Sequence, residues 1–147
     1  MWIKKSPVFG DHIRVCRGYY YHHGIYASND CIIHFASSNQ TDRINPAEAK
    51  IITTNLDNFL MGGELEVRIF TNEEITAKRT PSEIINYALL QVGTGLGSYN
   101  LINNNCEHFA NECVFGKKVS EQVNDVFSML FGGIKKWNLV LMLVGQL

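Results

Sequence analysis

The chain lacks the features that define several large classes of protein. It has only four cysteines in 147 residues and no apolar stretch behind its N-terminal lysines, so we expect neither a disulfide-stapled secreted domain nor a secretory signal. No run reaches the ~20 apolar residues of a membrane-spanning helix. Thirteen basic and 14 acidic residues leave a net charge of −1, which argues against a dominating basic field for polyanions. We therefore expect free thiols and a cytoplasmic location.

The sequence carries enough apolar residues for one well-packed domain. Hydrophobic residues make up 46% of the chain and charged residues 18%, a balance that excludes a disordered protein. We expect a single domain over residues 1–131 and a short apolar C-terminal tail over residues 132–147. Two placements of the tail stay open, one packed on the domain and one at a membrane surface.

Short apolar and aromatic runs separated by turn signals predict an antiparallel sheet. Three strands are expected within residues 11–36, because alternating apolar positions, an aromatic run and a second apolar run follow one another there. Residues 37–50 are polar and predict a loop. Further strands are expected over residues 51–59 and 65–70.

The second half of the chain carries helix signals. Thr80 begins a capping box with Pro81 at the first helical position, and an apolar stripe at helical spacing follows. A second helix is expected from Asn105 to Gly116, and a third from Ser120. The fold class is therefore α+β, with an antiparallel sheet packed against helices.

Cys106 is the most informative cysteine. It lies in the first turn of the helix expected from Asn105, where the positive end of the helix lowers a thiol pKa and favours a nucleophilic thiolate. The alternative is a small residue buried in the core, which is the usual fate of a free cysteine.

Histidine is the natural partner of such a thiol. His22 and His34 are 12 residues apart on neighbouring predicted strands, a separation that places their side chains next to each other. His22 and His23 are consecutive in one strand and therefore point to opposite faces. A base and an orienting group on paired strands, with a cysteine at a helix start, are typical of a thiol hydrolase or acyltransferase. Each histidine alone is also compatible with a structural role.

Two other uses of these residues are weaker. His108 follows Cys106 by two positions and does not face it on a helix, so a packing or surface role is expected. Cys16, Cys31, His12 and His34 lie near one another in the sequence, but no paired CxxC is present and strand spacing scatters the side chains. We expect no metal and no cofactor.

These motifs together resemble a known family. The segments Gly10-Asp11-His12-Ile13-Arg14, His22-His23-Gly24-Ile25-Tyr26 and Ile33-His34-Phe35 resemble the H-box of the lecithin:retinol acyltransferase and HRAS-like suppressor (PLAAT) phospholipase/acyltransferase family. The segment from Asn105 to Glu112 resembles its NC motif. The match covers most of residues 9–127 and is poorest over residues 37–79.

The resemblance implies a permuted papain-like domain in which the histidines precede the cysteine. It places the family's base on His22, its second histidine on His34 and its nucleophile on Cys106, with His23 where an aromatic residue is usual. In active relatives the cysteine attacks a phospholipid ester, holds the acyl group as a thioester and passes it to water or an amine.

Two departures from the family pattern are a short C-terminal apolar stretch and a middle segment, within residues 37–79, that is unlike that of the family. The apolar stretch from Trp137 to Val144 is short beside the long C-terminal anchor of cellular members. Gln146 resembles a site at which a polyprotein is cut after glutamine, as in the H-box/NC proteins at the 2A position of picornaviruses such as parechoviruses and kobuviruses. The resemblance therefore favours a non-protease viral protein that supports replication through host-protein, membrane or RNA contacts.

The alternative is an active cysteine-dependent phospholipase A or acyltransferase that forms an acyl-thioester on Cys106.

RNA binding is a further hypothesis, and it depends on four basic pairs meeting on one face. These pairs are Lys4-Lys5, Lys78-Arg79, Lys117-Lys118 and Lys135-Lys136. Their alternative role is that of ordinary solvated side chains.

Overall fold

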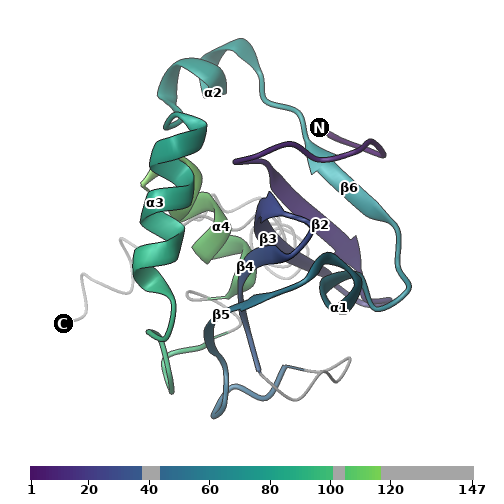
Figure 1. Ribbon diagram of the computed structural model, residues 1–147, viewed down its shortest axis with the longest axis vertical. Coiled ribbons are helices and arrows are strands. Elements are labelled where there is room, and N and C mark those ends of the chain that lie inside the picture. Colours follow the sequence, from purple (N-terminus) through teal and green to yellow (C-terminus); the bar gives the residue numbers. More distant parts are fainter. Residues whose placement is uncertain (38–43, 101–104, 117–147) are drawn as a thin grey trace, which may run out of the picture.

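The computed structural model describes residues 1–37, 44–100 and 105–116. Its centre is a six-stranded antiparallel sheet in the order β1-β6-β2-β3-β4-β5. Helices cover parts of both faces (Figure 1). The α+β class and the antiparallel sheet predicted from the sequence are confirmed.

The predicted meander forms the middle of the sheet. Its strands are β2 (His12–Cys16), β3 (Tyr21–Ser28) and β4 (Cys31–Ala36). Alternation along β2 turns Ile13 and Val15 to one face and His12 and Arg14 to the other, and Ile13 and Val15 are fully buried. The neighbours of the meander are β5 (Lys50–Thr54) and β6 (Leu65–Arg68).

The strand predicted over residues 51–59 is wrong in its second half. β5 ends at Thr54, and the Asn55 side chain then caps helix α1 (Leu56–Leu60) by accepting a hydrogen bond from the Asn58 backbone N–H. This cap supplies a local partner that a strand would not offer. Neither β1 (Trp2–Ile3) nor α2 (Asn72–Ala77) was predicted from the sequence.

Both predicted helix starts are confirmed. α3 (Pro81–Gln91) begins after a capping box between Thr80 and Glu83. α4 (Cys106–Phe115) begins after Asn105, whose side chain accepts hydrogen bonds from the backbone N–H groups of Glu107 and His108, and it ends at Gly116 in the left-handed conformation. The helix predicted from Ser120 and the tail over residues 132–147 lie outside the described residues.

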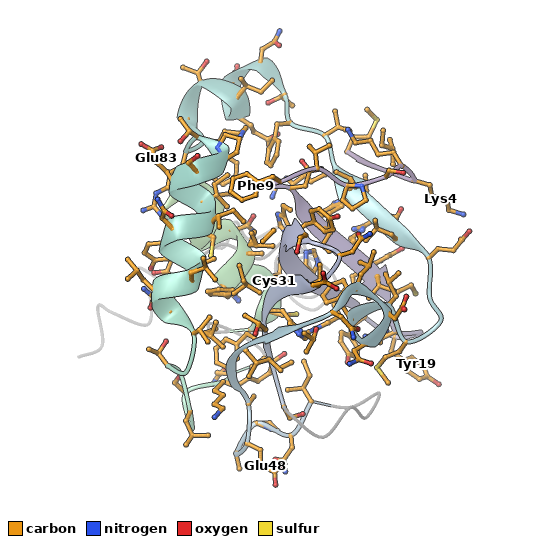
Figure 2. All side chains as sticks on the ribbon, viewed as in Figure 1. Lys4, Phe9, Tyr19, Cys31, Glu48 and Glu83 are labelled. Atoms are coloured by element: carbon orange, nitrogen blue, oxygen red, sulfur yellow. The ribbon has the colours of Figure 1, made fainter. Side chains whose placement is uncertain are left out.

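Two apolar clusters lie on opposite faces of the sheet. The larger one packs α3 and α4 against β3, β4 and β5, and includes Ile25, Ile33 and Phe35. The smaller one surrounds Phe59 of α1, against Ile13 and Ile32. Polar and charged side chains such as Lys4, Glu48 and Glu83 lie on the outside (Figure 2). Since β4 contributes to both clusters, it is buried on both faces, and this central position makes it a rigid support for a site.

Candidate active site

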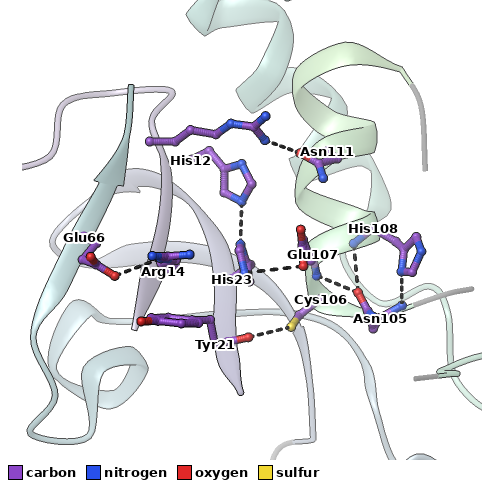
Figure 3. Close-up of polar contacts among 11 residues, drawn as sticks. His12, Arg14, Tyr21, His23, Glu66, Asn105, Cys106, Glu107, His108 and Asn111 are labelled. Carbon is purple, nitrogen blue, oxygen red and sulfur yellow. Dashed lines mark hydrogen bonds and ion pairs between the residues drawn. The ribbon is translucent and has the colours of Figure 1, made fainter. Parts of the chain in front are cut away.

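Cys106 lies at the first position of α4, where the helix meets the sheet. Its side chain is 2% exposed, and its thiol lies 3.9 Å from the backbone carbonyl oxygen of Tyr21 (Figure 3). The backbone N–H of His23 also points to the sulfur. In a strand, the carbonyl of one residue and the N–H two positions later face the same edge. The sulfur therefore lies against the edge of β3 at the level of His22.

That edge is open because β3 and β4 separate there. The described pairing of the two strands begins at Ile25, opposite Ile33, and runs away from the site. Among the strand pairs of the described residues, β3 continues toward Tyr21 paired with β2 on its other side, and β4 continues through His34 paired with β5. The N-terminus of α4 thus occupies the position that a further strand pairing would have taken.

His22 and His34 meet on this part of the sheet. His22 Nε2 and His34 Nδ1 are 2.7 Å apart, and His34 Nε2 is 3.0 Å from the Thr54 hydroxyl oxygen. The prediction that the two histidines are neighbours is confirmed. The register of Ile25 opposite Ile33 sets His34 at the level of Gly24, so His22 lies diagonally from His34, two residues along β3 on the same face. Thr54, on β5, was not identified from the sequence.

The remaining nitrogen of His22 is available for chemistry. His22 Nδ1 is buried and has no hydrogen-bond partner among the described residues. If His22 Nε2–H donates to His34 Nδ1 and His34 Nε2–H donates to the Thr54 hydroxyl, both nitrogens of His34 and Nε2 of His22 have partners. His22 Nδ1 then keeps a lone pair. This tautomer is the one that a general base requires.

Phe59 supports both imidazole rings. Its ring centroid lies 5.2 Å from that of His22 and 5.3 Å from that of His34. Gly24 makes this packing possible, because a Cβ at that position would lie 2.8 Å from the Phe59 ring. A cavity of about 240 Å³ opens beside the imidazoles, and it is lined by side chains that include Arg17, Tyr20, Ile44, Thr54 and Met61.

The thiolate expected at the helix start is not the resting form. Burial raises the pKa of Cys106 to about 11; the backbone N–H of His23 lowers that pKa and the Glu107 carboxylate raises it. The backbone N–H groups of Cys106 and Glu107 also lower the pKa of the thiol, as expected at a helix N-terminus. Removal from water outweighs them, so the prediction of a helix-stabilised thiolate is wrong and the thiol is protonated at neutral pH.

The two imidazoles are neutral for the same reason. Burial lowers the pKa of His22 well below its ordinary value, and the neighbouring His34 and Arg17 lower it further. Burial, with Arg17 as a second cause, lowers the pKa of His34 to about 3. Both rings therefore rest as neutral imidazoles at neutral pH, each with one N–H and one lone pair, and in the tautomer above only the lone pair on His22 Nδ1 is left to accept a proton.

Tyr99 is a site residue that sequence reasoning missed. Burial, the adjacent Cys106 thiol and Tyr20 raise the pKa of the Tyr99 hydroxyl, which interacts with both the thiol and the backbone N–H of Cys106. Its ring packs edge-on against Phe35, with centroids 4.9 Å apart. It lies in a loop before α4, and no periodicity marks such a position.

His108 and His23 do not join the His22 pair. His108 Nδ1 accepts a hydrogen bond from the Asn105 backbone N–H, so this side chain caps α4, which fits the packing role expected for it. His23 lies on the opposite face from His22, as predicted, and its Nδ1 is 2.9 Å from Nε2 of His12.

The other predictions are tested only in part. Within residues 1–37, 44–100 and 105–116, no helix is long and apolar enough to cross a bilayer, and no three metal-binding side chains converge. Lys4 pairs with Glu64 at 2.6 Å, and Arg79 donates to the carbonyl oxygens of Glu112 and Cys113. The basic pairs at 117–118 and 135–136 lie outside the described part of the chain, so RNA binding stays a prediction.

Comparison with known proteins agrees with the motif resemblance. Residues 5–119 match the family model described as lecithin retinol acyltransferase. The chain is 30% identical over 130 residues to human phospholipase A and acyltransferase 3, covering 82% of this chain and 78% of that protein. It is 26% identical over 150 residues to mouse lecithin retinol acyltransferase, covering 83% of this chain and 60% of that protein.

A further relative is human phospholipase A and acyltransferase 2, 30% identical over 128 residues, with 82% of this chain and 78% of that protein covered. These relatives are mammalian proteins. The picornavirus assignment, the replication role and the host-cell location therefore stay predictions. The match over residues 5–119 spans the whole described site, and the chain belongs to the lecithin retinol acyltransferase family.

Proposed function

We propose that the protein is a cysteine-dependent acyltransferase or phospholipase A that cleaves a lipid ester through an acyl-thioester on Cys106. The carrying observation is the position of the thiol at the edge of β3, at the level of His22. The Nδ1 atom of His22 has no hydrogen-bond partner among residues 1–37, 44–100 and 105–116, and its Nε2 atom begins the hydrogen-bond chain to His34 and Thr54. The printed names of the relatives, phospholipase A and acyltransferase and lecithin retinol acyltransferase, support the same reaction class.

The first half-reaction forms the thioester. His22 Nδ1 accepts the thiol proton as the sulfur attacks the ester carbonyl, and a sulfur–carbon bond forms. The carbon–oxygen bond of the ester then breaks, and the His22 imidazolium returns the proton to the departing alcohol. A neutral thiol and a neutral imidazole suit this path, because the proton moves only as the sulfur attacks.

The second half-reaction releases the acyl group. Water or an amine attacks the thioester carbonyl while His22 Nδ1 takes its proton. The sulfur–carbon bond breaks, and the sulfur leaves as the thiolate that His22 reprotonates. The backbone N–H of Cys106 and the Tyr99 hydroxyl lie beside the sulfur, and we assign them to the developing oxyanion in both steps.

Substrate enters beside the imidazole pair. The cavity of about 240 Å³ combines apolar side chains such as Ile44, Ile52 and Met61 with the polar groups of Thr54 and Asn58. This mixture suits the ester region of a lipid, where acyl carbon and polar oxygen meet. Arg17 lines the same cavity and is held by the carbonyl oxygens of Phe59 and Leu60.

The test is intact-protein mass spectrometry after incubation with phosphatidylcholine micelles. We expect one acyl adduct per chain, which disappears in Cys106→Ala and decreases strongly in His22→Ala. Cys16→Ala is the matched control, because this thiol is exposed on β2 and its loss leaves the site intact. A folded wild-type protein that forms no adduct, or an adduct that survives Cys106→Ala, contradicts the proposal.

A further inference from the structure

A second imidazole pair lies on the face of β3 opposite to His22 and close to the same cysteine. His12 and His23 are 0% and 1% exposed, and their hydrogen bond joins β2 to β3. His23 Nε2 lies 3.8 Å from Oε2 of Glu107, which follows Cys106 in α4 and is itself 3% exposed (Figure 3). The reaction described above uses neither imidazole of this pair.

The surroundings close this pair off from water. Trp2 of β1 packs edge-on against both rings, with centroid distances of 5.0 Å to His12 and 5.3 Å to His23. Arg14 lies over the Trp2 and Tyr21 rings and pairs with Glu66. The titratable and charged groups close to His23 are His12, Arg14, Arg68, Glu107 and Cys106.

The hydrogen-bond pattern fixes which nitrogen of His23 carries the proton. A lone pair on Nε2 aimed at the Glu107 carboxylate would be repelled by it, whereas an N–H there is attracted. His12 Nε2–H therefore donates to His23 Nδ1, and His23 carries its own proton on Nε2. The distance of 3.8 Å is longer than a hydrogen bond, so the attraction is electrostatic, and it acts between two side chains that are 2% and 3% exposed.

We propose that His23 is a positioning residue for Cys106, because its Nε2–H faces the Glu107 carboxylate, offsets that charge beside the thiol and holds the first turn of α4 against β3. The inference rests on the proposed function only in naming Cys106 the nucleophile. Without this partner, the buried carboxylate would act on the neighbouring sulfur with less compensation and disfavour its ionisation. The backbone N–H of His23 contacts the same sulfur, so side chain and main chain act together.

The experiment measures alkylation of Cys106 by iodoacetamide at pH 8, read by peptide mass spectrometry. We expect His23→Leu to slow the reaction at least about threefold, which corresponds to half a pKa unit on the thiol. His23→Gln keeps an N–H donor and should react at a rate close to that of the wild type. The exposed thiol of Cys16, in the same sample, should react equally in every variant and thus controls for the activity of the reagent.

A double substitution separates the charge effect from simple disruption. Adding Glu107→Gln to His23→Leu removes the buried carboxylate beside the thiol and should restore the alkylation rate. Glu107→Gln should accelerate the reaction less in the wild-type background than in the His23→Leu background. If His23→Leu does not fold, the comparison of His23→Gln with and without Glu107→Gln replaces it, and the expected result is a difference smaller than threefold.

Equal rates for wild type and folded His23→Leu, or a double variant that stays as slow as His23→Leu, would overturn the inference. In the comparison of His23→Gln with and without Glu107→Gln, a difference in alkylation rate of threefold or more would also overturn the inference. Alkylation reads the thiol without any lipid. A failure of lipid esters to acylate the wild-type protein would therefore contradict the proposed function and leave this result standing on its own.

Discussion

The pH dependence of Cys106 reactivity distinguishes a buried neutral thiol from a resting thiolate. With a pKa of about 11, the thiol is ionised in only about one molecule in 10,000 at pH 7. An ordinary free thiol, with a pKa of about 8.5, is ionised to about 3% at the same pH. The difference is a factor of about 300 in thiolate, or about 3 kcal/mol of added cost for ionisation.

The assay is the rate of iodoacetamide alkylation of Cys106 between pH 6 and pH 10. We expect the rate to rise about tenfold for each pH unit over the whole range, with no plateau, because the thiol stays below its pKa. Burial also limits access of the reagent, but this factor multiplies every point equally and does not change the slope. His22→Ala should keep the same slope.

A plateau between pH 6 and pH 8 would refute this reasoning. It would mean that the sulfur rests as a thiolate paired with an imidazolium, and that the helix N-terminus outweighs burial after all. The plateau would also require His22 to rest as an imidazolium, which the lowered pKa of that ring disfavours.

Three further predictions concern the residues around the thiol. Thr54→Val removes the acceptor of His34 Nε2 and should slow acylation about three- to tenfold, the effect of losing one net hydrogen bond. The mass assay measures this rate, and an unchanged rate contradicts a role for the hydrogen bonds that join His22, His34 and Thr54. Tyr99→Phe should slow it by up to about a hundredfold without loss of fold, as for an oxyanion donor, and an unaltered rate removes that role. Acid unfolding, followed by circular dichroism, should show stability that is full above about pH 6.5 and falls toward pH 4, by up to about 1.4 kcal/mol per pH unit for each imidazole. The sign follows because the unfolded chain binds protons first where the folded pKa is lowered, as it is for four buried histidines: His12, His22, His23 and His34. Constant stability over that range contradicts the neutral buried state.

Local signals explain which elements could be predicted. The capping boxes at Thr80 and Asn105 act within four residues, so α3 and α4 were expected at their observed starts. Period-two alternation likewise marked β2, and aromatic and apolar runs marked β3 and β4. The strand predicted through Phe59 failed because Asn55 caps a short helix there, and an apolar run of that length fits either structure.

The sequence by itself determined the candidate groups and their local placement: one cysteine at a helix start and two histidines on neighbouring strands, with His22 and His23 on opposite faces. Only the tertiary structure decided what those groups do. The separation of β3 from β4 lets Cys106 reach the strand edge, Thr54 and Tyr99 join the site from separate segments, and His23 of β3 comes to face Glu107 of α4. Burial by all of these elements sets the protonation of the thiol and the imidazoles, because desolvation depends on the sum of surrounding atoms and not on any local run of residues.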